Sequence, residues 1–451
     1  MLKLLLCLAL IAMMVSAVYA QPPTILWRDD AVAQNLTIDL PCKSKPSISG
    51  WLHTSGKNIL DENDNIVYLR GVNKWSTCVD NPWATWEKVT EDDFAHMKRV
   101  FPNMNTIWIL LQARKLYPNW SSGNYDVINE TYLGLIDNWV SWCGKYNLRC
   151  VLQMHYIDAE GMYNTPDVYS DFWTNNARYR ILLKNFHGLL AHRYKTNSAC
   201  VGFDILNEVG WTNSTLFKEM MTEVAQYIQS KNSNVLVIVQ WRSWYSGTTE
   251  NWLKTLGPIN LPNLVYNSHH YWRGLSDGTW NTSPYFDHIV NHYKLGDCAG
   301  GKTQMETDLK DAVLLNDVNV PCVIGEFGVA TTMGDDYPFL LYMRDFLHLM
   351  DKYNLGWSCF NWGASWHTYS LSFIKTNTRT ADKWEPPDAT YRPTVEVLKE
   401  FIGGFLIPAD KLALLPPYLA LLGLLVATTV AVAATRRRKR KQSTSCFLRL
   451  P

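Results

Sequence analysis

Short apolar runs alternate with amphipathic stretches along residues 48–404 of this 451-residue chain. Eight of the runs have the length and the β-branched content of buried strands; they are 66–73, 106–111, 149–155, 201–207, 235–241, 264–269, 320–326 and 355–362. Stretches with a helical period separate most of them; the clearest are 91–100, 131–146, 177–194, 216–230 and 337–351. The alternation predicts an α/β fold with a parallel sheet, and the length fits one (β/α)8 TIM barrel.

Two segments depart from this repeat. Residues 50–67 contain a glycine and an Asp-Glu-Asn turn, which predict a small N-terminal hairpin ahead of the first barrel strand. After the fifth run the sequence predicts only a short helix, near Glu250.

Both ends of the chain carry apolar runs that indicate export and membrane insertion. Residues 1–20 combine Lys3 with an apolar run and a final Ala20, as in a secretory signal peptide. Residues 412–434 are long and apolar enough to span a bilayer, and six basic residues follow at 436–441, which favours a cytoplasmic tail. A cleaved lipid-anchor signal is the alternative, but its apolar tail should end the chain.

These features predict a membrane protein of the cell surface, crossing the membrane once. The expected order is signal peptide 1–20, N-terminal extension 21–47, barrel domain 48–404, juxtamembrane segment 405–411, transmembrane helix 412–434 and basic cytoplasmic tail 435–451. Eight of the 42 Lys and Arg lie in the signal and the tail, which leaves 34 against 41 Asp and Glu in the exported part. That acidic balance argues against a nucleic-acid partner.

The cysteines and the glycosylation sequons of the exported part are typical of proteins from an oxidising compartment. The even number of cysteines predicts disulfides whose pairing the sequence does not give; they are Cys42, Cys78, Cys143, Cys150, Cys200, Cys298, Cys322 and Cys359. Five Asn-X-Ser/Thr sequons predict a glycoprotein; they begin at Asn35, Asn119, Asn129, Asn213 and Asn281.

Polar or aromatic residues end six of the eight predicted strands. They are Asn73, His155, Asn207 with Glu208, His269, Glu326 and Trp362. The carboxyl ends of the strands in such a barrel face the active site, so these side chains are expected to converge there.

The carboxylates Glu208 and Glu326 carry the predicted chemistry. Each follows a buried strand, in Phe-Asp-Ile-Leu-Asn-Glu and in Val-Ile-Gly-Glu-Phe-Gly. Desolvation at such a position favours the protonated form that a general acid needs. Either residue alone is more readily explained as a strand-end ion pair, but two facing carboxylates are what β-glycoside cleavage requires.

On these motifs the chain resembles glycoside hydrolase family five, a cellulase-like member of the clan of retaining (β/α)8 barrels. The resemblance covers about residues 50–404 and includes the entry hairpin with Leu-Arg-Gly-Val-Asn after it. It implies that Glu208 is the acid/base and Glu326 the nucleophile. It also implies substrate-binding roles for His155, Asn207, His269, Tyr271 and Trp362.

One position departs from the family pattern. The family usually has an arginine on the second strand, where it holds the nucleophile charged, and here Trp108 occupies that position. Either Gln112 or Arg114 takes over this role, since both share the strand parity of Trp108, or the nucleophile is less well supported and activity is altered or lost.

The sequence thus predicts a retaining, endo-acting β-glycoside hydrolase that cleaves β-1,4-glucan. A β-mannanase, a β-1,3-glucanase and a glycolipid endoglycosidase are alternatives, and a non-catalytic surface glycan receptor is the alternative from another class. The expected partners are a β-linked polysaccharide or oligosaccharide and the membrane. No phosphate-binding loop or metal-ligand spacing is evident, so no cofactor and no metal are expected.

Overall fold

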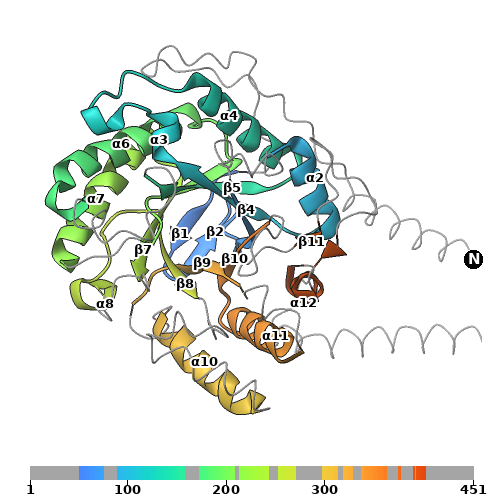
Figure 1. The fold of residues 1–451 in the computed structure, drawn as a ribbon. Coiled ribbons are helices and arrows are strands. Elements are labelled where there is room, and N and C mark those ends of the chain that lie inside the picture. The colour runs from blue at the N-terminus through green and yellow to red at the C-terminus, as the bar shows by residue number, and fades with distance from the viewer. Residues whose placement is uncertain are drawn as a thin grey trace, which may run out of the picture. The chain divides into compact units, whose positions relative to one another are not determined.

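Eight parallel strands close into a barrel with helices around it (Figure 1). This computed structural model describes residues 50–75, 89–157, 172–208, 213–242, 252–270, 297–312, 318–328, 337–362, 374–376, 390–391 and 393–402. The barrel strands, in chain order, are β3 (Arg70–Trp75), β4 (Thr106–Gln112), β5 (Arg149–Tyr156), β6 (Cys200–Asp204), β7 (Leu236–Arg242), β8 (Leu264–His270), β9 (Cys322–Phe327) and β10 (Gly356–Cys359). Each pairs with the next, and β10 closes the ring against β3, so the predicted (β/α)8 architecture is confirmed.

Alternation along each strand gives the barrel two apolar layers. On β4, Trp108 and Leu110 belong to the inner cluster, whereas Ile107 and Ile109 pack outward beneath the helices. A strand buried on both faces is therefore apolar at nearly every position, which is why these runs are conspicuous in the sequence.

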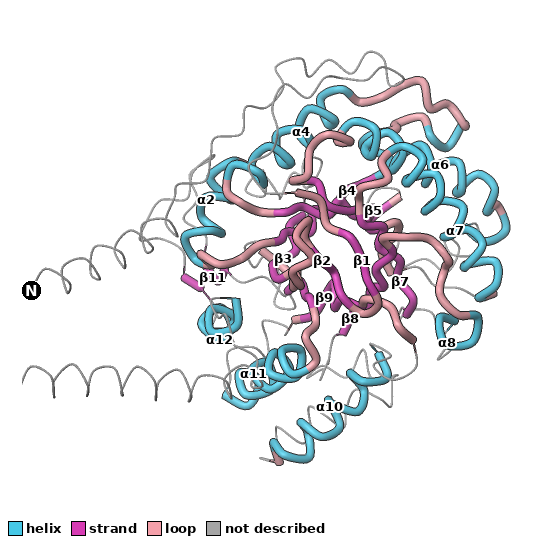
Figure 2. Tube along the Cα trace, turned by 180° about the vertical axis from the view of Figure 1, so that it is seen from behind, coloured by secondary structure: helices cyan, strands magenta, loops and turns pink. Residues whose placement is uncertain are grey.

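The inner cluster is closed at the start of the strands by a hairpin. Strands β1 (His53–Ser55) and β2 (Asn58–Leu60) are antiparallel and lie across the barrel opening (Figure 2). Leu52 and Ile59 from this hairpin pack into the inner cluster. The predicted hairpin is thus confirmed, and it covers the end of the barrel that is remote from the carboxyl ends of the strands.

Helices shield the outer layer. Those described are α2 (Glu91–Val100), α3 (Ala113–Leu116), α4 (Glu130–Lys145), α6 (Asn176–Arg193), α7 (Ser214–Lys231), α8 (Trp252–Leu256), α10 (Cys298–Ala312), α11 (Tyr337–Lys352) and α12 (Pro393–Ile402), with the 3-10 turn η1 (Trp120–Ser122). Asn129 and Asn213 cap α4 and α7 by accepting from main-chain N–H groups three residues on, at 3.0 Å in both cases. A two-stranded pair, β11 (Ile374–Thr376) and β12 (Thr390–Tyr391), completes the described elements.

Three strand boundaries differ from the prediction by three residues or more. The first strand begins at Arg70, because Ile66 bridges to Leu60 in the hairpin and is 49% exposed. Strands β6 and β10 end earlier than predicted, at Asp204 and Cys359. The motif residues Asn207, Glu208 and Trp362 therefore lie on the segments that follow these strands.

The prediction of disulfides is wrong for six of the eight cysteines. In the structure no disulfide is formed by Cys143, Cys150, Cys200, Cys298, Cys322 or Cys359. Cys143 from α4 and the register partners Cys150 and Cys200 are fully buried, where a thiol serves as a small apolar side chain. Burial raises the pKa of Cys143 and of Cys200 well above the usual range. Cys42 and Cys78 lie outside the described residues.

Contacts divide the chain into residues 1–403 and 404–451, and the second unit lies wholly outside the described residues. Within the part of the chain that the structure describes, no helix has the length and apolarity needed to cross a membrane. The predicted signal peptide at 1–20 and the predicted span at 412–434 both lie outside that part, so these remain predictions.

Candidate active site

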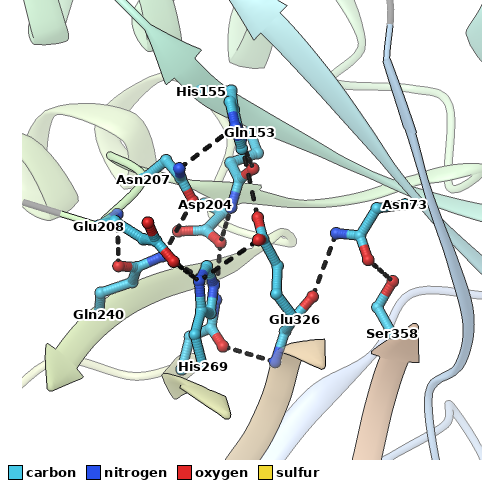
Figure 3. A network of polar contacts seen from close by, with 12 residues as sticks. Asn73, Gln153, His155, Asp204, Asn207, Glu208, Gln240, His269, Glu326 and Ser358 are labelled. Atoms are coloured by element: carbon cyan, nitrogen blue, oxygen red, sulfur yellow. Dashed lines mark hydrogen bonds and ion pairs between the residues drawn. The ribbon is translucent and has the colours of Figure 1, made fainter. Parts of the chain in front are cut away.

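The carboxyl ends of five barrel strands deliver polar side chains to one place (Figure 3). Strand β3 supplies Asn73, β5 His155, β8 His269 and β9 Glu326, and the turn after β6 supplies Glu208. All five side chains are buried. The convergence predicted from the strand ends is therefore present for these residues.

The two glutamates face each other across His269. The Nδ1 atom of His269 lies 2.9 Å from Oε1 of Glu208 and 3.6 Å from Oε2 of Glu326. One oxygen of each glutamate and one ring nitrogen of His269 all lie within 4.8 Å of one another. This short spacing fits a retaining pair, whose carboxyl groups stand about 5–5.5 Å apart, better than an inverting pair at about 6.5–9.5 Å.

Glu208 occupies a strained main-chain position. Its φ angle is +40°, a region that residues with a side chain adopt rarely. Its N–H donates to Oε1 of Gln240 at 2.6 Å, and the preceding Asn207 N–H donates to the Met154 carbonyl at 3.0 Å. Backbone strain of this kind persists where surrounding contacts over-determine it, as at active sites.

Glu326 depends on the glycine before it. The carbonyl of Gly325 accepts from Nδ2 of Asn73 at 3.1 Å, and its N–H donates to Oδ1 of Asn267 at 2.7 Å. A Cβ at position 325 would lie 2.3 Å from the Asn267 amide. Glycine is thus the residue that lets Asn267 pack against the backbone that leads into Glu326.

The two histidines experience opposite electrostatic influences. Burial, together with the neighbouring His269, lowers the pKa of His155 well below its usual range. Burial also opposes charge on His269, whereas the carboxylates of Glu326, Glu208 and Asp204, while they are ionised, act to raise its pKa above the usual range. His155 Nδ1 lies 3.7 Å from Oε1 of Glu326 and 2.8 Å from Oε1 of Gln153.

A second layer of polar side chains, which the sequence analysis did not identify, lies beneath these groups. Asp204 is fully buried and accepts at 2.9 Å from both Gln153 and Asn267. Burial raises the pKa of Asp204 to about 6, against the opposing effect of these hydrogen bonds. Gln153 and Asn267 each stand two residues before a predicted site histidine, so strand parity was the available signal.

The substitute for the family arginine is not where the sequence suggested. Trp108 lies in the inner barrel cluster, near the Asp204 carboxylate. Arg114 is exposed on α3, because β4 ends at Gln112 and the strand parity does not continue. Gln112 is buried at the end of β4, and the described chain shows no hydrogen bond from its side chain to Glu326. The interpretation that Arg114 takes over is wrong.

The predicted aromatic of the eighth strand faces away from the barrel interior. Trp362 is fully buried in the outer cluster, with ring contacts to His96 and Phe101 of the α2 region at centroid distances of 5.5 and 6.2 Å. Phe360, two residues earlier, packs half-buried against the inner cluster instead. The substrate-binding role expected for Trp362 stays a prediction. Tyr271 lies outside the described residues.

Among the described residues, Glu208, His269 and Glu326 form the one convergence of three groups able to hold a metal ion. We interpret it as a catalytic pair, because His269 is hydrogen-bonded directly to Glu208 and because both glutamates stand where glycoside chemistry needs them.

A closed (β/α)8 barrel with two buried carboxylates at its carboxyl end defines the class of retaining glycosidases. A family model described as Cellulase (glycosyl hydrolase family 5) matches residues 60–365. The chain belongs to this family and is a glycoside hydrolase.

Relatives of known activity agree with this assignment. Endoglucanase C of Acetivibrio thermocellus is 25% identical over 284 residues, which cover 56% of this chain and 77% of that protein. An endoglucanase of Paenibacillus polymyxa is 22% identical over 269 residues, or 53% of this chain and 65% of that protein.

Solved structures share the fold. The catalytic domain of Thermobifida fusca endoglucanase Cel5A has a TM-score of 0.55 at 16% identity, covering 79% of this chain and 98% of that one. Endo-glycoceramidase II from Rhodococcus sp. has a TM-score of 0.53, also at 16% identity, covering 78% of this chain and 81% of that one.

Proposed function

We propose that this chain is a retaining endo-β-1,4-glucanase. The observation that carries the proposal is the placement of Glu208 and Glu326 within 4.8 Å around His269 at the carboxyl end of the barrel. Support for the substrate comes from the relatives, which are named endoglucanases, and from the family to which the chain belongs.

In this proposal each glutamate has one role, taken from the family motifs that the two residues match. Glu326 attacks the anomeric carbon while Glu208 donates its proton to the glycosidic oxygen, so the bond to the leaving sugar breaks as the ester bond to Glu326 forms. In the second step a water molecule gives its proton to Glu208 and its oxygen attacks the same carbon. The ester bond breaks, Glu326 leaves as a carboxylate, and the anomeric configuration is retained.

Reducing-sugar release by the full-length chain in detergent micelles tests the substrate. The panel contains a soluble β-1,4-glucan, a β-1,3-glucan, a β-mannan and a glycosphingolipid. We expect release from the β-1,4-glucan and a loss of at least 10³-fold in Glu326→Gln. Release from another member of the panel would reassign the substrate. Glycan binding without any release would favour the surface receptor.

We also propose that the enzyme acts outside the cell, held by residues 412–434. The support is the sequence alone: an apolar signal at 1–20, an apolar run of spanning length and the basic residues that follow it. The exposed sequon residues Asn119 and Asn213 are accessible to a glycosylation machinery on that side of the membrane.

A further inference from the structure

Two amide side chains beside His269 have orientations that the main chain fixes. Oε1 of Gln240 accepts from the Glu208 N–H at 2.6 Å, and Oδ1 of Asn267 accepts from the Gly325 N–H at 2.7 Å. A main-chain N–H can only donate, so each amide must turn its oxygen toward the backbone and its NH2 group away from it. The usual ambiguity between amide oxygen and nitrogen is thereby removed.

Both NH2 groups face the same ring nitrogen. Gln240 Nε2 lies 3.0 Å and Asn267 Nδ2 lies 3.4 Å from Nε2 of His269. The same two nitrogens also donate to Asn207 Oδ1 at 3.4 Å and to Asp204 Oδ2 at 2.9 Å. An amide nitrogen has no lone pair to offer, so the ring nitrogen between them must accept.

The hydrogen bonds around His155 require the same protonation of its ring (Figure 3). Asn207 Nδ2 stands 3.3 Å from His155 Nε2, and His155 Nδ1 stands 2.8 Å from Gln153 Oε1. Gln153 then donates to Asp204 at 2.9 Å. Donors and acceptors match at every step only if both histidines carry their proton on Nδ1 and none on Nε2.

We propose that Gln240 and Asn267 hold His269 as the neutral imidazole protonated on Nδ1, which makes it a directed hydrogen-bond donor to Glu208, with Glu326 3.6 Å from the same nitrogen, rather than a cation between the two glutamates. This inference rests on the proposed function, because it concerns how the same two glutamates are positioned. It makes Gln240 and Asn267 positioning residues of the reaction.

The carboxylates around the His269 ring oppose its neutral form, whereas the hydrogen bonds of the two amides require it. Asp204 and Glu208 from the β6 side and Glu326 from β9 favour a second proton, whereas burial and the neighbouring His155 on β5 disfavour it. A proton on Nε2 would point at two NH2 groups. It would require Gln240 or Asn267 to turn over and to present that NH2 to a main-chain N–H.

The position of Trp108 agrees with a site whose nucleophile lies beside neutral side chains. Its indole lies in the inner cluster at the place where the family usually has an arginine. Nδ1 of His155 and Nδ1 of His269 lie 3.7 and 3.6 Å from the oxygens of Glu326. With both rings neutral, neither histidine places a positive charge beside the nucleophile.

Nitrogen-15 NMR of the full-length chain, labelled at histidine and held in detergent micelles, tests the protonation state. The His269 signals are identified by their loss in His269→Gln. At pH 6.5 we expect Nδ1 to be pyrrole-like, with its proton, and Nε2 to be pyridine-like, without one. Two protonated ring nitrogens would overturn the inference.

A variant reverses the direction of one hydrogen bond. Gln240→Glu places an oxygen opposite Nε2, while its other oxygen still accepts from Glu208. We expect the His269 ring to become doubly protonated and kcat to fall at least tenfold, with KM within about threefold. Gln226→Glu makes the same chemical change on the exposed face of α7 and should alter neither the ring signals nor the kinetics.

The outcomes separate this inference from the proposed function. A neutral ring in a chain that cleaves no β-glucan would leave the inference standing and reject the function. If the His269 ring stays neutral in a folded and active Gln240→Glu variant, the inference is rejected and the proposed function stands. If that variant fails to fold, the spectrum of the natural chain alone decides.

Discussion

Glu208 and Glu326 take their positions from neutral side chains beside them. Gln240 holds the strained backbone of Glu208, and Asn267 holds the backbone that leads into Glu326. These amides therefore hold the main chain at the two proposed catalytic groups.

Gly325→Ala tests this dependence. The added Cβ would lie 2.3 Å from the Asn267 amide, so Asn267 must move and release both Gly325 and Asp204. We expect kcat to fall at least 10²-fold and stability to fall by about 1–3 kcal/mol, the range for overpacking a buried site. The measurements are glucan hydrolysis and urea unfolding.

Gly134→Ala is the matched control. A Cβ at this position on α4 meets nothing within 4 Å. Alanine in a helix interior is more stable than glycine by about 0.5–1 kcal/mol, so we expect unchanged kcat and slightly higher stability. Equal losses of kcat in both variants would contradict the role of Asn267.

The sequence indicated the two glutamates and the two histidines that converge in the site, but not the amides that support them. A glutamate or histidine at the end of an apolar strand is conspicuous, whereas Gln153, Gln240 and Asn267 lie inside strands. The hydrogen-bond partners of an inward-facing amide within a strand can be identified only when the register of the neighbouring strands is known.

At the scale of elements, all eight barrel strands and the main helices were predictable, because apolar periodicity is strong in elements buried on one or both sides. The ends of the strands were not. Strand β10 stops at Cys359, and the chain then carries Trp362 outward to pack on α2. Nothing local marks that stop, because Phe360 and Trp362 continue the apolar pattern.

Helix α6 is tied to the catalytic turn by a buried histidine. Nε2 of His187 donates to the carbonyl of Ile205 at 2.8 Å, and burial lowers the pKa of His187 to about 4. The native state therefore keeps the ring neutral while the unfolded chain takes up a proton near pH 6.5. The stability contributed is complete above pH 6.5 and is lost as the pH falls toward 4.

We expect His187 to account for about 3 kcal/mol of the loss of unfolding free energy between pH 6.5 and 4. Urea unfolding at a series of pH values should show a shallower pH dependence in His187→Gln. Some dependence should remain, because burial also lowers the pKa of His96 to about 4. An unchanged slope would contradict the contribution of His187.

At the scale of the whole molecule, the barrel and the membrane segment rest on different kinds of support. The barrel is described by the structure, and the family covers residues 60–365. The segment at 412–434 is predicted from apolarity and the flanking positive charge alone.

Fractionation of expressing cells tests the predicted span. We expect the full-length chain to remain in the membrane pellet through high salt and alkaline carbonate, because an inserted helix does not depend on ion pairs. A chain ending at Lys411 should be released into the medium with its glucanase activity. Extraction of the full-length chain by carbonate would contradict the span.

Trapping of the glycosyl-enzyme tests the central claim most directly. A 2-deoxy-2-fluoro β-cellobioside with an activated leaving group slows both steps of a retaining reaction, but the second step more, so the covalent intermediate accumulates. Mass spectrometry of the digested protein should find one cellobiosyl-sized addition, on the peptide that contains Glu326. An addition on Glu208, or glucan hydrolysis with inversion and no covalent adduct, would contradict the account.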